Sequence, residues 1–224
     1  EKWKIAEVGR IGEEKFRREY GCEFLIFDET LINSIKLAIM EGVNPLIQMG
    51  QIRWYKKPDP KKSYVVALDP AMGTGGDYAA IQVVELPTYQ QVGEWRHNTT
   101  AIPGQIRILA DVCKYLSDSM KTDSNIYWSV ENNGIGEACL LVINDFGEEN
   151  IPGLFISEPI RKGHVRKFRK GFNTTHSSKT TACARLKTML ENDKLTVQSK
   201  ALISELKAYI AAGSSFQAKP GHTD

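Results

Sequence analysis

The sequence has few cysteines and no long apolar run, and each shortage excludes a class of protein. Its four cysteines lie far apart and include no C-x-x-C pair: Cys22, Cys113, Cys139 and Cys183. This pattern argues against a zinc site or a disulfide scaffold and suits reduced thiols. The apolar runs, such as residues 64–68, are too short to span a membrane. The first residues include neither a signal-peptide core nor a methionine, so we expect a cytoplasmic domain cut from a longer protein.

Motifs for binding nucleotides and catalytic zinc are also absent. No G-x-x-x-x-G-K-[ST] sequence occurs, because Ser178 stands where a glycine would have to precede Lys179. The glycines of residues 73–76 lead into a predicted strand rather than a helix, so they predict a tight hairpin and not a dinucleotide-binding loop. The four histidines show no H-E-x-x-H spacing. We therefore expect neither a small-molecule cofactor nor zinc catalysis.

The composition is that of a globular domain, but the charge is unevenly distributed. Of the 224 residues, 42% are hydrophobic and 25% are charged, with a net charge of +2. Residues 160–190 hold nine Lys and Arg and no Asp or Glu, which leaves 20 basic and 27 acidic residues elsewhere. An acidic body with one basic segment is typical of a nucleic-acid contact. The alternative is a charged loop that is simply solvated.

The order of predicted elements indicates an α/β fold. Strand-like patterns cover residues 63–68, 78–86, 89–97, 125–130 and 154–156. Helix-like patterns cover residues 103–119, 134–146, 178–192 and 201–210. The first three strands have short connections, which favours an antiparallel meander, and the remaining strands alternate with helices. We therefore predict an RNase H-like mixed sheet, with an antiparallel meander plus parallel strands, flanked by helices.

The first quarter of the chain reads differently. It contains possible helices at residues 3–20 and 30–40, a possible strand at 23–27 and a run rich in β-formers at 47–55. A polar, proline-containing joint follows at residues 56–62. We predict an N-terminal helical and linker segment over residues 1–60. The main domain would then cover residues 61–224. The apolar run from Ser63 to Leu68 predicts a strand that is buried on both faces.

Three acidic residues stand where the pattern predicts a strand end or a turn. Asp69 directly follows the first predicted strand of the domain, and Glu131 directly follows the fourth. Asp77 lies eight residues after Asp69, at the far end of the glycine-rich turn, where it could face Asp69. Each has a simpler interpretation: Asp69 and Asp77 as turn residues, and Glu131 as a helix cap.

Carboxylates that converge from two strand ends repel each other unless a divalent cation neutralises them. Oxygen ligands of this kind suit Mg²⁺ or Mn²⁺. Two such ions about 4 Å apart would activate water and stabilise the departing oxygen of a phosphodiester. Asp224, which ends the sequence, matters only if it joins such a group.

Four short stretches resemble, in the same order, the large terminase subunit of tailed bacteriophages. They are residues 20–24 (YGCEF), residues 66–70 (VALDP) with 73–78, residues 130–134 (VENNG) and residues 222–224 (HTD). The resemblance covers only the C-terminal nuclease half of that protein, which agrees with the missing P-loop. In this family the last motif usually has two adjacent acids ahead of an apolar helix. We therefore expect a truncated C-terminal end, with either Asp224 or an absent neighbour as the third ligand.

The resemblance implies an RNase H-like, metal-dependent endonuclease that cuts concatemeric viral DNA during headful packaging. Its cofactor would be two Mg²⁺ or Mn²⁺ ions. Asp69 would bridge both ions, Glu131 and Asp224 would each hold one, and Asp77 could add a further ligand. The basic segment would bind the DNA backbone with little base readout. The candidate DNA contacts are Arg161, Lys162, Arg166, Lys167, Arg169, Lys170 and Lys179.

The implied partners are double-stranded DNA and, in the full-length protein, an N-terminal packaging ATPase, the portal and the small terminase. No membrane is expected, and the location would be the host cytoplasm. Two alternatives stay open. One is a resolvase- or transposase-type nuclease with the same carboxylates. The other is a non-catalytic module that binds DNA or docks on the portal, in which the acids are only caps.

Overall fold

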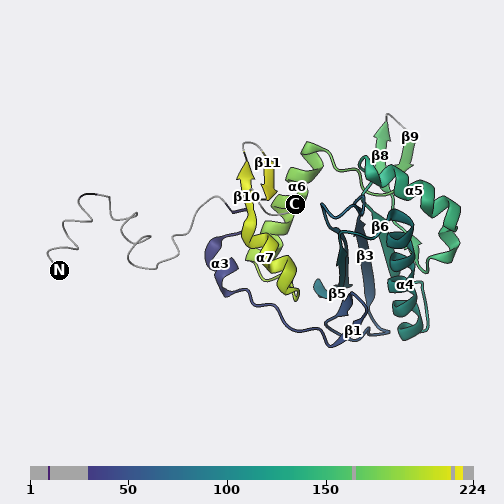
Figure 1. Cartoon of the computed structure of the whole chain (residues 1–224), viewed down its shortest axis with the longest axis horizontal. Helices are drawn as coiled ribbons and strands as arrows, with labels where there is room; N and C mark the ends of the chain where they lie inside the picture. The colour runs from purple at the N-terminus through teal and green to yellow at the C-terminus, as the bar shows by residue number, and fades with distance from the viewer. Residues whose placement is uncertain (1–9, 11–29, 163–164, 213–214, 219–224) are drawn as a thin grey trace.

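The computed structural model describes residue 10 and residues 30–162, 165–212 and 215–218 (Figure 1). The predictions of a helix at residues 3–20, apart from Arg10, and of a strand at residues 23–27 lie outside this part of the chain. No helix in the described ranges is long and apolar enough to cross a membrane.

A seven-stranded mixed sheet forms the centre of the molecule, with the strand order β1-β2-β5-β4-β3-β6-β7. Strands β3 (Ser63–Asp69), β4 (Ala79–Leu86) and β5 (Gln90–His97) form an antiparallel meander. Strands β6 (Ile126–Val130) and β7 (Leu154–Phe155) run parallel to β3. The predicted meander followed by parallel strands is therefore confirmed, and every predicted strand of the main domain lies within two residues of its observed bounds.

The sheet is extended at one edge by a hairpin of strands β1 (Ile47–Met49) and β2 (Ile52–Trp54). Strand β2 pairs with β5 through Arg53 and Trp54, so residues from the first 60 contribute to the sheet. The short helix α3 (Ser34–Ile39) precedes this hairpin. The division of the chain near residue 60 stays a prediction.

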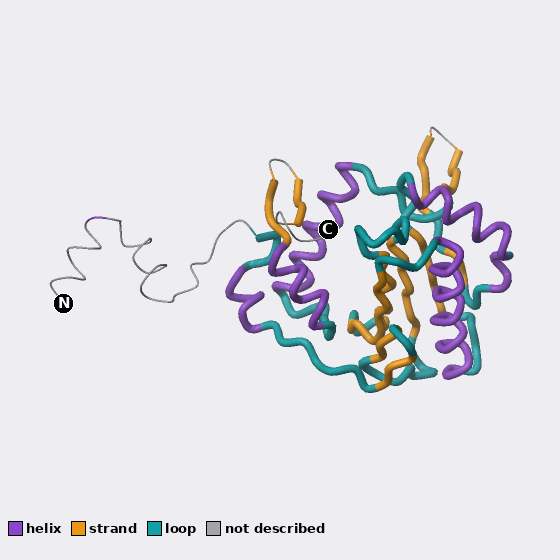
Figure 2. Tube along the Cα trace, in the orientation of Figure 1, coloured by secondary structure: helices purple, strands orange, loops and turns teal. Residues whose placement is uncertain are grey.

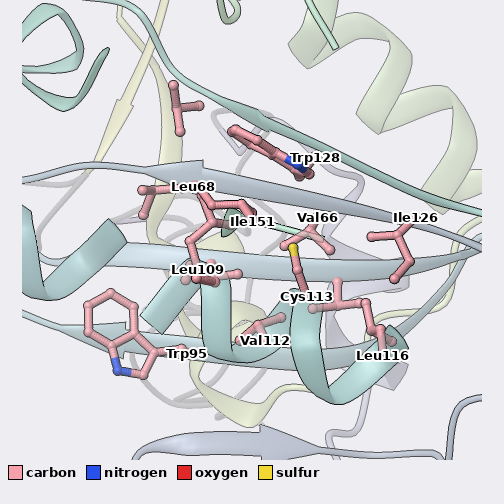
Figure 3. Packing of buried hydrophobic residues seen from close by; sticks show 14 of the residues in the cluster. Val66, Leu68, Trp95, Leu109, Val112, Cys113, Leu116, Ile126, Trp128 and Ile151 are labelled. Atoms are coloured by element: carbon pink, nitrogen blue, oxygen red, sulfur yellow. The ribbon is translucent and has the colours of Figure 1, made fainter. Parts of the chain in front are cut away.

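The main hydrophobic core lies between one face of the sheet and two helices, α4 (Ile102–Met120) and α5 (Ile135–Phe146) (Figure 3). Alternate residues of β4, such as Ile81 and Val83, are buried on the helix-covered face of the sheet. On α4, Leu109 and Leu116 are buried on the side that faces the sheet. Each such side chain contributes about 1.5–3 kcal/mol to folding when it is fully buried. A 3₁₀ turn, η1 (Glu148–Asn150), leads from α5 towards β7.

The prediction that the first domain strand is buried on both faces is wrong. In β3, Tyr64, Val66 and Leu68 are buried against the helices, whereas Ala67 and Asp69 are exposed on the other face. Alternation of side chains along a strand explains the pattern. The second face lacks close cover at this end of the strand, and it is the face that carries the acids.

The second face of the sheet is approached by a separate group of elements (Figures 1 and 2). These are α6 (His176–Glu191), α7 (Lys200–Ala208) and the hairpin of β10 (Tyr209–Ala212) and β11 (Ser215–Ala218). With α3 they form a second, smaller core around Leu37, Leu190 and Ile203. The predicted helix at residues 201–210 ends two residues early, because the chain turns into β10.

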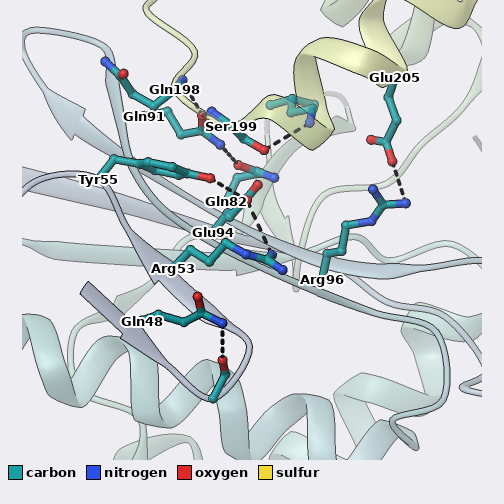
Figure 4. Close-up of polar contacts among 12 residues, drawn as sticks. Gln48, Arg53, Tyr55, Gln82, Gln91, Glu94, Arg96, Gln198, Ser199 and Glu205 are labelled. Carbon is teal, nitrogen blue, oxygen red and sulfur yellow. Dashed lines mark hydrogen bonds and ion pairs between the residues drawn. The ribbon is translucent and has the colours of Figure 1, made fainter. Parts of the chain in front are cut away.

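Polar contacts join this smaller group to the sheet at one end (Figure 4). The side-chain oxygen of Gln91, on β5, accepts hydrogen bonds from the backbone N–H groups of Gln198 and Ser199. The Gln91 amide in turn donates to Gln82 on β4. These contacts tie the start of α7 to the sheet.

The basic segment contains a hairpin that the sequence pattern did not predict. In the described part of the chain, strands β8 (Glu158–Lys162) and β9 (Val165–Arg169) form a two-stranded sheet of their own, which extends beyond the central sheet (Figure 1).

Candidate active site

A cleft of about 810 Å³ lies between the second face of the sheet and the helices α6 and α7. Its floor is formed by residues from four neighbouring strands and includes Asp69 on β3, Arg96 on β5 and Glu131, which directly follows β6. Its opposite wall includes Lys179 on α6 and Glu205 on α7. The cleft therefore brings both predicted strand-end acids together with basic side chains.

Asp69 is the last residue of β3, and its backbone is held by the strand pairing opposite Ala80 on β4. Glu131 follows β6, which runs parallel to β3 at its other side, and its backbone N–H donates to the Leu68 carbonyl at 2.9 Å. Parallel neighbours end at the same edge of a sheet, so the two carboxylates reach the same end of the cleft.

Glu131 is held on its other side by the chain that returns from the basic hairpin. Phe172 forms a parallel bridge with Glu131, donating to the Val130 carbonyl at 2.9 Å and accepting from Asn132 at 2.7 Å. The approach needs Gly171, where φ is +72° and a Cβ would lie 2.6 Å from the Val130 carbonyl oxygen. Backbone on both sides thus makes the position of Glu131 rigid.

A second close approach brings helix α5 against Glu131. Gly136, in the first turn of α5, is buried, and a Cβ there would lie 1.9 Å from the carbonyl oxygen of Glu131. Any other residue would push the helix away from this strand end. The result opposes the interpretation of Glu131 as a simple helix cap, because α5 has no side-chain cap hydrogen bond and begins after Gly134.

The Glu131 carboxyl group lies close enough to Asp69 to act on its pKa. Asp69 is reached by water from the cleft, yet the surrounding walls take much of its hydration away. This desolvation, the hydrogen bond and charge of Glu131, and the charge of Asp77 together raise the pKa of Asp69 well above its usual range, while Lys179 opposes the rise. A divalent cation would offset the repulsion between the two carboxylates. The donor set therefore fits a hard cation that prefers carboxylate oxygens.

Asp77 lies close enough for its charge to act on Asp69, but it is exposed and does not line the cleft. The glycines connect the antiparallel strands β3 and β4, as predicted, but the turn between them is not tight. Residues 70–78 form an open loop that is tied to the end of β5, where Gly75 and Asn98 exchange hydrogen bonds. A role for Asp77 as a metal ligand stays a prediction.

The third predicted acid, Asp224, lies outside the described residues. Among the residues that the structure does describe, no three His, Cys, Asp or Glu side chains gather closely enough to hold a metal ion. The site within the described part of the chain is therefore a pair of acids, Asp69 and Glu131.

The predicted DNA contacts divide into three places. Lys179 lines the cleft opposite Asp69, with its ammonium 5.9 Å from the centre of the Tyr209 ring. Lys170, at the base of the hairpin, is exposed and pairs with Glu148 at 2.6 Å. The other five lie on β8 and β9, and their side chains lie outside the described part of the structure: Arg161, Lys162, Arg166, Lys167 and Arg169.

The cleft also contains residues that the sequence pattern did not single out. Arg96 lies on its floor with Tyr78 beside it, and Glu205 lies on the opposite wall. Nothing in their local sequence distinguishes them from ordinary surface residues. Only the strand register and the position of α7 place them in the same cleft as Asp69.

Comparisons with known proteins agree with this architecture. A family model described as the terminase RNaseH-like domain matches residues 66–224. The large terminase nuclease of the thermophilic phage G20c, solved with bound magnesium, is 16% identical, with a TM-score of 0.62 over 88% of this chain and 92% of that chain. Its cobalt-bound structure is also 16% identical and gives a TM-score of 0.60 over 86% and 89%.

The nuclease domain of the large terminase of Thermus phage P74-26 is 17% identical, with a TM-score of 0.57 over 84% of this chain and 86% of that chain. At these identities the matches show a common fold. The family model matches more than half of the sequence and includes both Asp69 and Glu131. This protein belongs to the terminase RNase H-like domain family, as the order of its short motifs predicted.

Proposed function

We propose that this domain is a metal-dependent endonuclease that cuts concatemeric phage DNA during headful genome packaging. The observation that carries the proposal is the pair of Asp69 and Glu131, held at one end of a cleft by adjacent parallel strands. Among the described residues, neither acid forms an ion pair with a Lys or Arg side chain, and such an uncompensated pair is typical of a site for a divalent ion. Membership in a terminase nuclease family supports the same substrate.

Asp69 and Glu131 would hold the metal, together with Asp224 or a neighbouring acid. The G20c nuclease was solved with magnesium and with cobalt, which supports a divalent ion here, and we propose two Mg²⁺ or Mn²⁺ ions. When bound, such ions supply an activated water and stabilise the departing oxygen of a phosphodiester. The chain itself supplies rigid carboxylates and, at Lys179, a positive charge in the cleft that would face a phosphate group of bound DNA.

The basic residues on β8 and β9 would bind the DNA backbone outside the cleft. They belong to one hairpin, and the segment that follows β9 contacts Glu131 through Phe172. DNA bound there would therefore approach the acidic pair directly. Because phosphate contacts carry little sequence information, this arrangement suits an enzyme that cuts many sequences. In the full-length protein we propose an N-terminal packaging ATPase, the portal and the small terminase as partners, acting in the host cytoplasm.

The test is cleavage of supercoiled plasmid in Mg²⁺ or Mn²⁺. We expect nicking and linearisation that EDTA abolishes and that Asp69→Asn reduces by about 10²–10⁴-fold, as the loss of several kcal/mol of transition-state stabilisation would require. The matched control is Asp118→Asn, the same chemical change at an exposed position on α4 across the sheet from the cleft. Equal cutting by Asp69→Asn and Asp118→Asn would contradict the proposal. Cutting confined to branched DNA would instead favour the resolvase alternative.

A further inference from the structure

Arg96 lies in line with Asp69 across three strands of the sheet. Asp69 on β3 is opposite Ala80 on β4, and Ala80 is opposite Arg96 on β5. Residues opposite each other across a sheet point to the same face, so the Arg96 side chain enters the cleft that holds the acidic pair. Two strand spacings separate their Cα atoms by roughly 10 Å.

The guanidinium group of Arg96 is held in a defined orientation. It stacks on the Tyr78 ring, with its central carbon 3.8 Å from the ring centre. One terminal nitrogen, Nη2, pairs with the Glu205 carboxylate at 2.9 Å (Figure 4). The Nε atom is buried and has no hydrogen-bond partner among the described residues. A stacked arginine with an unused donor matches a tetrahedral or planar oxyanion better than a lysine would.

Glu205 reaches Arg96 from the other wall of the cleft, on α7. Its environment disfavours a negative charge: burial raises its pKa, and the charge of Glu94 adds to this, although Arg96 opposes both. Glu94, in contrast, already accepts a hydrogen bond from Tyr55 at 2.6 Å. Of the two acids, Glu205 is therefore the one whose negative charge is stabilised by Arg96. It also lies on α7, which is not part of the sheet.

We propose that Arg96 is a positioning residue for the DNA substrate, and that Glu205 occupies its phosphate-binding place while DNA is absent. The proposal rests on the nuclease function proposed above. A separation of roughly 10 Å from Asp69 corresponds to about three nucleotides measured along the axis of a duplex, at 3.4 Å each. Arg96 thus binds a backbone phosphate within about three nucleotides of the bond that is cut, and entry of the strand replaces the carboxylate of Glu205 by that phosphate.

The experiment measures the binding of a fluorescently labelled 30-base-pair DNA to the whole chain in EDTA, where no cutting occurs. Arg96→Gln should weaken binding about tenfold or more, because a charge-assisted contact is lost. It should also lower the slope of log affinity against log salt by about 0.9, the value for one phosphate. Arg96→Lys should keep the slope but not the full affinity. In the cutting assay, Arg96→Gln should raise KM more than it lowers kcat.

Glu205→Gln provides the opposite change. We expect it to tighten binding about two- to fivefold, because a partly exposed ion pair stabilises the free state only modestly. In the Arg96→Gln background the same substitution should have no effect. A general charge effect of removing an acid from the cleft would persist in that background and would contradict the proposal. If Arg96→Gln does not fold, as judged by thermal unfolding, Arg96→Lys and Glu205→Gln carry the test.

The outcomes separate this inference from the function on which it rests. Wild-type cutting that depends on Asp69, with an unchanged affinity and salt slope in both Arg96 variants, overturns the role of Arg96 alone. A wild-type chain that neither binds nor cuts DNA overturns both. Weaker binding in Arg96→Gln and Glu205→Gln alike, with lower unfolding temperatures, would show a purely structural ion pair and would overturn the phosphate site.

Discussion

The strand pair β3–β4 carries a carboxylate near each end, and the two have opposite environments. At one end Glu85 is fully buried. It accepts hydrogen bonds from Lys56 at 2.9 Å, Thr88 at 2.8 Å and Tyr64 at 3.3 Å. At the other end Asp69 meets a second acid, Glu131. Burial alone raises the pKa of both groups, but the hydrogen bonds and the charge of Lys56 outweigh it at Glu85, where the net shift is downward.

This difference separates an acid that stabilises the fold from an acid that is free for chemistry. A buried carboxylate with a cation and two hydroxyl donors is satisfied by the protein itself. A carboxylate whose nearest partner is another carboxylate is satisfied only by a proton or by something that binds. Sequence position does not distinguish them, since both lie at the ends of apolar strands.

The largest expected effect is a loss of activity at the acidic pair of Asp69 and Glu131. Glu131→Gln should reduce plasmid cutting by about 10²–10⁴-fold, for the same reason as Asp69→Asn. It should not lower the urea midpoint, because the substitution removes a repulsion and keeps a hydrogen-bonding group. Both are measured on the same preparation. A fall in the midpoint that matches the fall in activity would mean that Glu131 is structural.

At the other end Glu85→Gln should have the opposite outcome. Removing the charge leaves Lys56 without its partner and weakens three hydrogen bonds, so we expect a loss of about 3 kcal/mol in the free energy of unfolding. Urea unfolding at pH 7 measures it. Activity per folded molecule should stay at the wild-type level. Unchanged stability would place Glu85 outside the network that holds β3 and β4.

The stability from Glu85 should depend on pH with a definite sign. Because its pKa is lowered in the folded state, its contribution is present above the usual glutamate pKa and is lost as the pH falls through the folded value. The difference in unfolding free energy between wild type and Glu85→Gln should therefore be constant near neutral pH and shrink below about pH 4. Urea titrations from pH 2.5 to pH 7 test this, and a difference that grows in acid would contradict it.

Metal binding offers a smaller effect at the acidic pair. Mg²⁺ at 100 times its dissociation constant should stabilise the wild-type chain by about 2.7 kcal/mol, and EDTA should reverse this. Asp69→Asn should abolish the shift, whereas Glu85→Gln should retain it. Thermal unfolding with and without Mg²⁺ provides the measurement. A shift of equal size in all three proteins would indicate general ion effects rather than a site.

The smallest expected effect concerns Lys170. Its ion pair with Glu148 is exposed at both ends, so Lys170→Gln should change the free energy of unfolding by less than about 1 kcal/mol. If Lys170 contacts a phosphate, the same variant should lower the salt slope of DNA binding by about 0.9. An unchanged slope would remove it from the DNA contacts.

Much of the fold could be predicted because its signals are local. The alternation in β4, the apolar run of β3 and the amphipathic pattern of α4 depend on neighbours only a few residues apart. The hairpins β8–β9 and β10–β11 were missed, since their charged or mixed sequences carry no such periodicity. The burial of β3 was misjudged, because whether a second layer covers a strand is a property of distant residues.

The sequence by itself determined which strands form and that Asp69 and Glu131 end two of them, because strand formation and strand ends depend on short-range side-chain patterns. Only the tertiary structure decided that the two acids share a cleft, that Glu85 is compensated and that Arg96 pairs with Glu205. Those outcomes depend on strand register and on where α7 packs. Electrostatic energies vary with separations of a few ångströms, and residues far apart in the sequence set those separations.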